Sequence, residues 1–292
     1  MTRHEYHVAL ASCRELPEPD PDAAPLALAL RAAGIEAAVL AWDDPRADWS
    51  RAPLTVLRST WNYPTRRAEF LAWAERAAAT SDLWNPLPVV RWNTHKAYLL
   101  ELERQGVPIA PTLLLPRGST VTLDEVLGPR GWREVVLKPA VSAASRGTRR
   151  FGPREADAGE QHLRRLLEDH DVLLQRYLPS VEGHGERALV WIDGELTHAV
   201  RKRPRFEGED ESVSTASVPI SPAEARLARR VIETVGHPLL YARVDVAPGA
   251  LDEPLLMELE LVEPSLFFLQ CPPALERFVA AIRLRLEARG PT

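Results

Sequence analysis

Apolar runs and polar breaks alternate along the first 90 residues and predict an open α/β sheet. The segments 7–12, 35–40 and 54–58 have the length and composition of strands, and the segments 26–33 and 66–79 have the longer apolar spacing of helices. Gly34 ends the first of these helices. Because strands that alternate with helices are typical of a mainly parallel sheet, residues 1–90 are expected to form an N-terminal α/β domain.

The rest of the chain predicts further helices and strands. Helices are expected at 95–105, 123–127, 160–168, 222–235 and 274–288. Strands are expected at 112–115, 134–138, 172–175, 187–192, 195–200, 243–246 and 255–261. Together with the N-terminal domain, this pattern indicates a mixed α/β and α+β fold class.

Composition is that of an ordinary globular protein and excludes several classes. Of the 292 residues, 45% are hydrophobic and 26% are charged, so the chain can bury a core without metal or disulfide support. The net charge of −5 is spread without long runs of one sign, so neither a nucleic acid nor a membrane surface is an expected partner. The eight histidines lack the spacing of zinc ligands. Two distant cysteines and the absence of an 18-residue apolar stretch indicate a cytoplasmic protein.

Lysine and asparagine are both scarce. The 36 basic residues include only three lysines, which are Lys96, Lys138 and Lys202. Codon usage explains the many arginines, and a retained lysine indicates a position that requires a compact ammonium group, with chance survival as the alternative. Each of the three asparagines follows a tryptophan: Asn62, Asn85 and Asn93.

Lys138 ends the expected strand 134–138 and precedes a loop of small residues, 141–147. This order places an ammonium group beside main-chain N–H groups that can approach phosphate oxygens closely. No Gly-x-x-x-x-Gly-Lys sequence is present, so the loop is not a Walker A loop. A surface lysine before a turn is the alternative of equal weight.

Acidic residues mark two neighbouring strands in the last third of the chain. Asp245 lies on the expected strand 243–246, and Glu258 and Glu260 share one face of the strand 255–261. Carboxylates side by side among apolar residues repel one another unless a cation lies between them. Because oxygen ligands suit Mg²⁺, these three residues form the predicted metal site. The alternative is the solvent face of an amphipathic strand.

Gln175, Tyr177 and Leu178 lie at the end of the expected strand 172–175. Such a strand end can present an amide and main-chain groups to the edge of an adenine, and apolar side chains to its faces. Other strand ends share this composition, so the signal is weak when it stands alone.

These segments, taken in order, resemble the ATP-grasp superfamily, and within it the branch of glutathione synthetase and ribosomal-protein glutamate ligase. The resemblance covers residues 91–270 and rests on Lys96, Val-Val-Leu-Lys138-Pro, Leu-Leu-Gln175-Arg-Tyr-Leu, Gly-Glu186-Arg187, Arg-Val-Asp245 and Met-Glu258-Leu-Glu260-Leu-Val-Glu263-Pro. The segments Arg58-Ser-Thr-Trp-Asn-Tyr and 258–268 also resemble cycloserine synthetase, an ATP-grasp enzyme that closes a small ring on O-ureidoserine.

The resemblance implies a role for each matching position. The ATP phosphates would be bound by Lys96, Lys138, Ser142, Ser145 and Gly147. The adenosine would be bound by Gln175, Tyr177, Leu178 and Glu182. The catalytic cations would be Arg187 and Lys202, and the Mg²⁺ ligands Asp245, Glu258 and Glu260.

The substrate is assigned to residues at the end of the strand 54–58, where open α/β sheets commonly bind ligands. The assigned residues are Arg58, Ser59, Thr60 and Asn62, together with Glu263. A salt bridge at a domain interface is the alternative for Arg58. Trp61 and Tyr63 are expected to pack against other side chains and not to bind substrate.

The implied enzyme has an ATP-grasp fold with an N-terminal domain (1–90), a lid subdomain (111–174) and a central and C-terminal ATP-grasp domain (91–110 and 175–292). With ATP and Mg²⁺ it would convert the carboxylate of a small amino-acid-like substrate into an acyl phosphate, which an amine displaces to give an amide or a ring. A kinase that stops at a phosphorylated product and a catalytically silent nucleotide-binding module are the alternatives. Members of the family are often dimers, which makes a homodimer one expectation.

Two positions depart from the family pattern. Glu260 stands where glutathione synthetases carry asparagine, which adds negative charge to the metal site. The loop after Lys138 contains fewer glycines than the usual lid loop, which leaves its hold on the γ-phosphate open.

Overall fold

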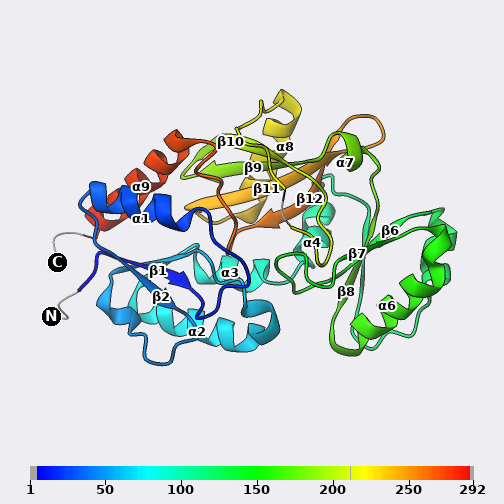
Figure 1. The fold of residues 1–292 in the computed structure, drawn as a ribbon, viewed down its shortest axis with the longest axis horizontal. Helices are drawn as coiled ribbons and strands as arrows, with labels where there is room; N and C mark the ends of the chain where they lie inside the picture. Colours follow the sequence, from blue (N-terminus) through cyan, green and yellow to red (C-terminus); the bar gives the residue numbers. More distant parts are fainter. Residues whose placement is uncertain (1–4, 211, 290–292) are drawn as a thin grey trace.

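The protein contains three four-stranded sheets, named here the N-terminal, middle and C-terminal sheets. The structure is a computed structural model that describes residues 5–210 and 212–289. The N-terminal and C-terminal sheets lie next to each other, and the middle sheet lies at the opposite end of the molecule from the two termini (Figure 1). No helix in the described ranges is long and apolar enough to cross a membrane.

The N-terminal sheet is parallel, as the alternation of strands and helices predicted, and its strand order is β2-β1-β3-β4. Its strands are β1 (Val8–Ser12), β2 (Ala37–Ala41), β3 (Leu54–Leu57) and β4 (Asp82–Trp84). Their connections contain α1 (Ala23–Ala32), α2 (Arg67–Thr80) and the 3₁₀ turns η1 (Trp49–Arg51) and η2 (Tyr63–Arg66). Every side chain of β1 and β3 is buried, which is typical of internal strands in a parallel sheet.

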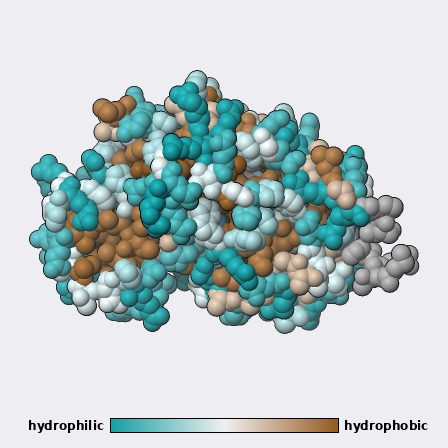
Figure 2. Space-filling view, turned by 180° about the vertical axis from the view of Figure 1, so that it is seen from behind, coloured by the Kyte–Doolittle hydropathy of each residue, from teal (hydrophilic) through white to brown (hydrophobic). Residues whose placement is uncertain are grey.

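The middle sheet is antiparallel and has the order β5-β8-β6-β7. Its strands are β5 (Thr112–Leu115), β6 (Val135–Pro139), β7 (Arg149–Phe151) and β8 (Val172–Arg176). It also carries α5 (Leu123–Leu127), α6 (Ala156–Asp169), η3 (Gly128–Arg130) and η4 (Pro153–Glu155). Leu163 and Leu167 on α6 pack with Leu123 and Phe151 in a core that serves this sheet alone. Apolar surface gathers at this end of the molecule when it is seen from behind (Figure 2).

The C-terminal sheet is also antiparallel and has the order β10-β9-β11-β12. Its strands are β9 (Glu186–Ile192), β10 (Glu195–Lys202), β11 (Tyr241–Pro248) and β12 (Pro254–Glu260). Four further helices are α3 (Leu87–Asn93), α4 (Tyr98–Arg104), α7 (Ser180–Gly183) and α8 (Pro222–Val235). The capping box of Ser221 and Glu224 fixes the start of α8. The last helix, α9 (Pro272–Glu287), packs against α1.

The N-terminal and C-terminal sheets share one hydrophobic core. Val8 and Leu10 of β1 belong to the same cluster of buried side chains as Val190 of β9, Tyr241 of β11 and Phe278 of α9. The middle sheet has one core of its own, and its Leu173 also packs in a cluster with Leu189 of β9 and Val244 of β11. The division of the chain at residues 90, 110 and 174 stays a prediction, and its last boundary falls inside β8.

Each predicted helix and strand occurs, with ends shifted by at most four residues. Four elements were missed, namely β4, α3, β7 and α7. They contain three to seven residues, which is too few for a periodic pattern to stand out. In α3, Pro88 occupies the first turn, where the missing N–H costs nothing. The helix predicted from residue 95 begins instead at Tyr98, and the Lys96 N–H before it donates to the Ala140 carbonyl at 2.7 Å.

Candidate active site

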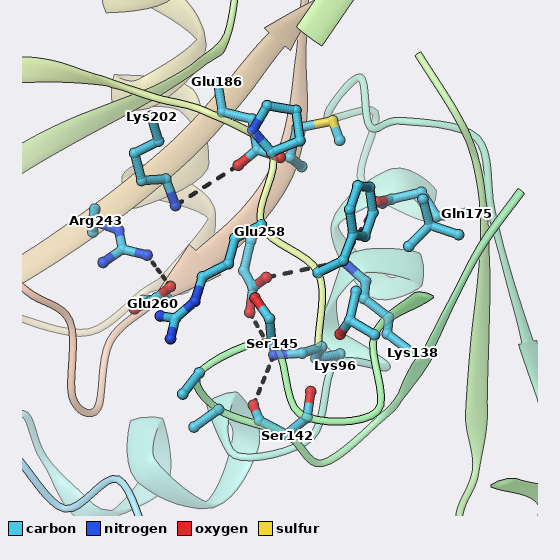
Figure 3. A pocket seen from close by; sticks show the side chains of 18 of the residues that line it. Lys96, Lys138, Ser142, Ser145, Gln175, Glu186, Lys202, Arg243, Glu258 and Glu260 are labelled. Atoms are coloured by element: carbon cyan, nitrogen blue, oxygen red, sulfur yellow. Dashed lines mark hydrogen bonds and ion pairs between the residues drawn. The ribbon is translucent and has the colours of Figure 1, made fainter. Parts of the chain in front are cut away.

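One pocket collects charged side chains from the middle sheet, the C-terminal sheet and the turn before α4. Its charged and amide lining includes Lys96, Lys138, Gln175, Glu186, Lys202, Arg243, Glu258 and Glu260 (Figure 3). All three lysines of the chain lie in it. The pocket therefore joins the middle sheet to the body formed by the other two sheets.

Two lysines share one glutamate. Lys96 Nζ is ion-paired with Glu258 and also donates to the Ser142 carbonyl at 3.1 Å (Figure 3). Lys138 Nζ lies 3.9 Å from Glu258 Oε2 and 3.4 Å from Gln175 Oε1. Burial opposes the charge of Glu258, but Lys96 and Lys138 hold its pKa at about 2. Burial lowers the pKa of Lys138, and Glu258 offsets this only in part, so an anion in the pocket would stabilise this ammonium group.

A second group of charges lies on β9, β10, β11 and β12. Lys202 Nζ contacts Asp245 Oδ2 at 2.5 Å and Glu186 Oε2 at 3.7 Å. Arg243 Nε donates to Asp245 Oδ1 at 2.9 Å, and its Nη2 is ion-paired with Glu260. The antiparallel register places Asp245 opposite Glu258 and Arg243 opposite Glu260. Because side chains two positions apart share a face, these four residues project from the same side of the sheet.

The predicted metal ligands are paired with cations of the protein itself. Lys96, Lys202 and Arg243 supply positive charge beside these acids, and the assignment of a metal ion to them stays a prediction. Within the ranges that the structure describes, no three acidic, histidine or cysteine side chains are grouped closely enough to hold a metal ion.

The same acids nevertheless carry more negative charge than the pocket readily accommodates. Burial raises the pKa of Glu260 to about 7, because the contributions of Asp245 and Glu258 counteract that of Arg243. Burial also raises the pKa of Glu186. When buried carboxylates lie close together, their negative charges repel one another. A divalent cation such as Mg²⁺, which prefers oxygen ligands, would relieve this repulsion. Glu258 and Glu260 line the pocket and fit this role, whereas Asp245 does not line it.

The residues predicted to hold an adenine lie together at the end of β8. Gln175, Tyr177 and Leu178 all line the pocket and are buried. The Gln175 amide donates to Thr112 Oγ1 at 3.1 Å, which fixes its orientation. Glu182 lies outside the pocket lining, because its carboxylate accepts hydrogen bonds from the Tyr177 hydroxyl at 3.0 Å and from Arg150 at 2.7 Å.

The loop after Lys138 adopts left-handed backbone conformations although it has few glycines. Ala144 and Ser145 have φ angles of 50° and 56°, and Gly147 has 71°. Left-handed non-glycine residues cost on the order of 1 kcal/mol each. The Gly147 N–H donates to Glu207 at 3.0 Å, and a Cβ at Gly147 would lie 2.9 Å from the Pro139 side chain. Ser142 and Ser145 line the pocket, whereas Gly147 does not line it and instead allows the loop to turn.

Known proteins share both this sequence and this fold. A family described as the N-terminal domain of D-cycloserine synthetase DcsG matches residues 8–85. The cycloserine biosynthesis protein DcsG of Streptomyces lavendulae is 35% identical over 92% of this chain and 95% of its own. The chain belongs to the D-cycloserine synthetase family.

Solved structures agree with this membership. The crystal structure of D-cycloserine synthetase DcsG has a TM-score of 0.87 and 34% identity, and the match covers 96% of this chain and 99% of that one. The ATP-grasp ligase PsnB, solved with its minimal precursor, Mg and ADP, has a TM-score of 0.64 at 19% identity, over 97% and 99% of the chains. The expected ATP-grasp fold and the expected class of ATP-dependent ligase are thereby confirmed for this member of the family.

Arg187 does not reach the pocket of this family member. Its Nε lies 3.6 Å from Glu224 Oε1, and its Nη2 donates to the Pro219 carbonyl at 3.5 Å. The neighbouring Glu186 lines the pocket, because successive side chains of a strand point to opposite faces. Lys202 is the predicted catalytic cation that lines the pocket, whereas Arg187 does not line it, and the placement of Arg187 beside the phosphates stays a prediction.

Arg58 is buried between the N-terminal and C-terminal sheets. Its guanidinium lies 3.4 Å from the buried Asp22 and 5.7 Å from the centre of the Tyr241 ring. The interface salt bridge, given above as the alternative role for Arg58, is the arrangement found. Arg58 does not line the pocket, and its assignment to the substrate stays a prediction.

Two other polar residues of this segment, Ser59 and Asn62, form side-chain hydrogen bonds within the protein. Ser59 Oγ donates to Asp20 at 2.5 Å, and Asn62 accepts a hydrogen bond from the Trp42 indole at 2.6 Å. Thr60 is fully buried. None of these three lines the described pocket. Their assignment to the substrate also stays a prediction.

Trp61 and Tyr63, expected to pack, are the residues of this segment that line the pocket. The Trp61 indole donates to the Glu263 carbonyl at 2.8 Å, and the Tyr63 hydroxyl is hydrogen-bonded to the Glu263 carboxylate. Glu263 also lines the pocket, so it is the predicted substrate residue that the fold places there.

Sequence reasoning missed six further charged residues of the lining, which are Glu18, Arg176, Glu186, Arg203, Arg205 and Arg243. Arg243 could have been found, because it lies two positions before Asp245 on the same strand face. Glu186 carried no local signal that separated it from Arg187. Arg205 lies in the loop after β10 and binds Glu18, from the loop after β1, at 2.6 Å. This contact joins loops 187 residues apart, which no local pattern can reveal.

Proposed function

We propose that this ATP-dependent ligase activates the carboxylate of a small amino acid with ATP and closes a ring onto a nitrogen of the same molecule. The observation that carries the proposal is the single pocket in which Lys96, Lys138 and Lys202 face Glu258 and Glu260. A relative that spans nearly the whole chain is a cycloserine biosynthesis protein, which supports a ring-forming reaction on a small substrate.

In this proposal the residues of the middle sheet position the nucleotide. Gln175, Tyr177 and Leu178 bind the adenine, and Lys138 neutralises the phosphates at the end of β6. Lys96 exchanges its ion pair with Glu258 for a phosphate oxygen, which a flexible ammonium group can do at little cost. The loop 142–148 covers the phosphates with Ser142 and Ser145 and excludes water from them.

The reaction then proceeds in two displacements. A carboxylate oxygen of the substrate attacks the γ-phosphorus, and the bond between that phosphorus and ADP breaks to leave an acyl phosphate and ADP. The substrate nitrogen attacks the acyl carbon, the carbon–oxygen bond breaks, and inorganic phosphate leaves while the nitrogen gives up a proton. Lys202, held by Asp245 and Glu186, supplies a fixed cation near the charge that develops.

A Mg²⁺ ion held by Glu258 and Glu260 would offset phosphate charge during the transfer, while Asp245, the third predicted ligand, holds Lys202 beside them. The raised pKa of Glu260 supports this assignment, because burial and neighbouring acids leave that carboxylate short of positive charge.

The test is ADP and phosphate release from Mg-ATP in the presence of O-ureido-D-serine or its L form. We expect ADP and phosphate in equal amounts with the D form, together with a cyclic product. Lys138→Met should lower kcat/KM at least about 100-fold, because a buried phosphate-facing cation contributes about 3 kcal/mol in such sites. Arg229→Met, at an exposed position of α8, is the matched control and should retain full activity.

Three results would separate the alternatives. ADP without free phosphate, accompanied by a phosphorylated product, would mean a kinase. Hydroxamate formed from pooled carboxylates with hydroxylamine, without turnover of O-ureidoserine, would mean a ligase that joins two molecules. Failure of every carboxylate to stimulate ADP release would refute carboxylate activation altogether.

A further inference from the structure

Glu263 differs from the other glutamates of the pocket in its lack of a cation partner. Four other glutamates line the pocket, and each has an ion pair: Glu18 with Arg205, Glu186 with Lys202, Glu258 with Lys96, and Glu260 with Arg243. Among the described residues, no lysine, arginine or histidine is ion-paired with Glu263, although it lies in the same cavity. A buried carboxylate without a cation partner costs free energy, and a ligand that carries a positive charge would offset this cost.

The surroundings of Glu263 are built to hold its side chain in the pocket. The Trp61 indole N–H anchors the Glu263 main chain at 2.8 Å. The Tyr63 hydroxyl, on a side chain that is only 4% exposed, is hydrogen-bonded to the carboxylate. Both aromatic residues come from the segment after β3, so the N-terminal sheet positions an acid that belongs to the C-terminal part of the chain.

The electrostatics of Glu263 agree with a missing positive charge. Burial, followed by the charge of Glu260, raises the pKa of Glu263 to about 8. Lys96 and the hydrogen bond from Tyr63 act in the opposite direction but do not compensate. A primary ammonium group placed beside the carboxylate would restore its charge and form a charge-assisted hydrogen bond.

We infer that Glu263 binds the α-ammonium group of the substrate, so that the enzyme selects amino acids over the corresponding acids without an amine. This inference rests on the proposed function and deepens it. Glu263 raises the pKa of Lys96, so the two groups interact across the pocket. A substrate whose ammonium group binds Glu263 would direct its carboxylate toward Lys96 and hence toward the phosphates. The amine would then be held by the protein, and the ring nitrogen would come from elsewhere in the substrate.

The first test compares O-ureido-D-serine with its deamino analogue, 3-(carbamoylaminooxy)propanoate, by the kcat/KM of ADP release. We expect the wild-type protein to prefer the amine-bearing compound at least about 100-fold, the discrimination typical of a site whose buried polar group would otherwise stay unpaired. Glu263→Gln should narrow the preference to less than about 10-fold, chiefly through KM. Glu233→Gln, an exposed acid on α8, is the matched control and should keep the wild-type preference.

Tyr63→Phe is a second variant that keeps the ring and removes only the hydroxyl group. It should weaken the preference for the amine in the same direction as Glu263→Gln but by a smaller factor. The melting temperature of each variant shows whether it is folded. If Glu263→Gln fails to fold, Tyr63→Phe still tests whether Glu263 binds the ammonium group.

A second test does not depend on turnover. Calorimetry with D-serine and with 3-hydroxypropanoate, in the presence of Mg-ADP, measures recognition of the amine directly. We expect D-serine to bind more tightly to the wild-type protein, and Glu263→Gln to remove the difference while the Kd for Mg-ADP stays within about two-fold. If O-ureidoserine is not turned over while this binding difference persists, the proposed ring closure fails and the amine site stands.

Several results would overturn the inference. One is equal binding of D-serine and 3-hydroxypropanoate by the wild-type protein, or no binding of either compound. Another is an unchanged preference in Glu263→Gln. A loss of Mg-ADP affinity in Glu263→Gln would instead assign this carboxylate to the metal and nucleotide.

Discussion

Single buried amides connect the parts of this protein. Asn85 is fully buried, donates to the Tyr241 and Leu261 carbonyls at 2.9 and 2.7 Å, and accepts from the Leu240 N–H at 2.8 Å. Asn93 likewise donates to the Leu259 carbonyl at 2.9 Å and accepts from the Leu261 N–H at 2.8 Å. These two side chains satisfy main-chain groups at the ends of β11 and β12, which explains why asparagine persists in a chain that has only three.

Replacement of Asn85 by leucine should therefore destabilise the protein. Asn85→Leu preserves the approximate size but leaves two carbonyls and one N–H buried without partners. We expect the free energy of unfolding to fall by about 3 kcal/mol, since each such group costs on the order of 1–3 kcal/mol. Urea denaturation followed by tryptophan fluorescence measures the change. Gln161→Leu, at an exposed position of α6, should change it by less than about 0.5 kcal/mol. Equal effects of the two substitutions would show that the Asn85 hydrogen bonds contribute nothing specific.

At the scale of elements, two loops meet across the pocket. The loop after β1 contributes Glu18 and the loop after β10 contributes Arg205, and both residues line the pocket. Their contact is bidentate, with distances of 2.6 and 3.2 Å. The loop of Arg205 also contains Glu207, which accepts a hydrogen bond from Gly147 in the loop after β6. One chain of contacts thus links loops of all three sheets over the charged lining.

Glu18→Gln should loosen this closure without removing any group assigned to the nucleotide. The amide keeps the shape of the carboxylate but loses the charge that fixes the guanidinium in a planar pair. The side chain of Arg205 is 19% exposed and that of Glu18 is 32% exposed, so solvent weakens the ion pair. We therefore expect the KM for ATP to rise about 3- to 10-fold, which corresponds to about 1 kcal/mol. Asp44→Asn, which breaks the exposed Asp44–Arg46 pair, is the control and should leave KM unchanged. An unchanged KM in Glu18→Gln would show that the contact plays no part in closure.

At the scale of the whole molecule, the pocket lies between the middle sheet and the body formed by the other two sheets. The middle sheet has its own core, whereas the N-terminal and C-terminal sheets share one. Lys138 and Gln175 come from the former, and Lys202, Glu258 and Glu260 from the latter. A nucleotide bound between them would make the two parts resist unfolding together.

Mg-ADP should therefore raise the melting temperature of the whole chain. At 100 times its Kd, a ligand that binds only the folded state adds about 2.7 kcal/mol, which corresponds to several degrees. Differential scanning calorimetry with and without Mg-ADP measures the shift. Addition of EDTA should remove most of it, and Lys138→Met should show little shift at the same concentration. A shift of equal size in Lys138→Met would contradict the placement of the phosphates at this lysine.

The sequence by itself determined which segments form helices and strands, and which lysines belong to the site. Strand and helix identity follows from the local spacing of apolar residues, which is why every predicted element occurs. Three lysines among 36 basic residues indicated positions that need an ammonium group, and all three line one pocket. The resemblance of ordered segments indicated the family that the comparisons confirm.

Only the tertiary structure decided which side chains face the pocket. A strand has two faces, and the sequence does not say which of them meets another sheet, so Arg187 was chosen where Glu186 lies in the pocket. In the segment after β3, irregular backbone turns Arg58 inward and brings Trp61 to the pocket. Because this segment is neither helix nor strand, the spacing of its residues does not predict which side chains share a face. The ion pair of Glu18 with Arg205 depends on the packing of distant loops, because charge complementarity across space leaves no trace in local spacing.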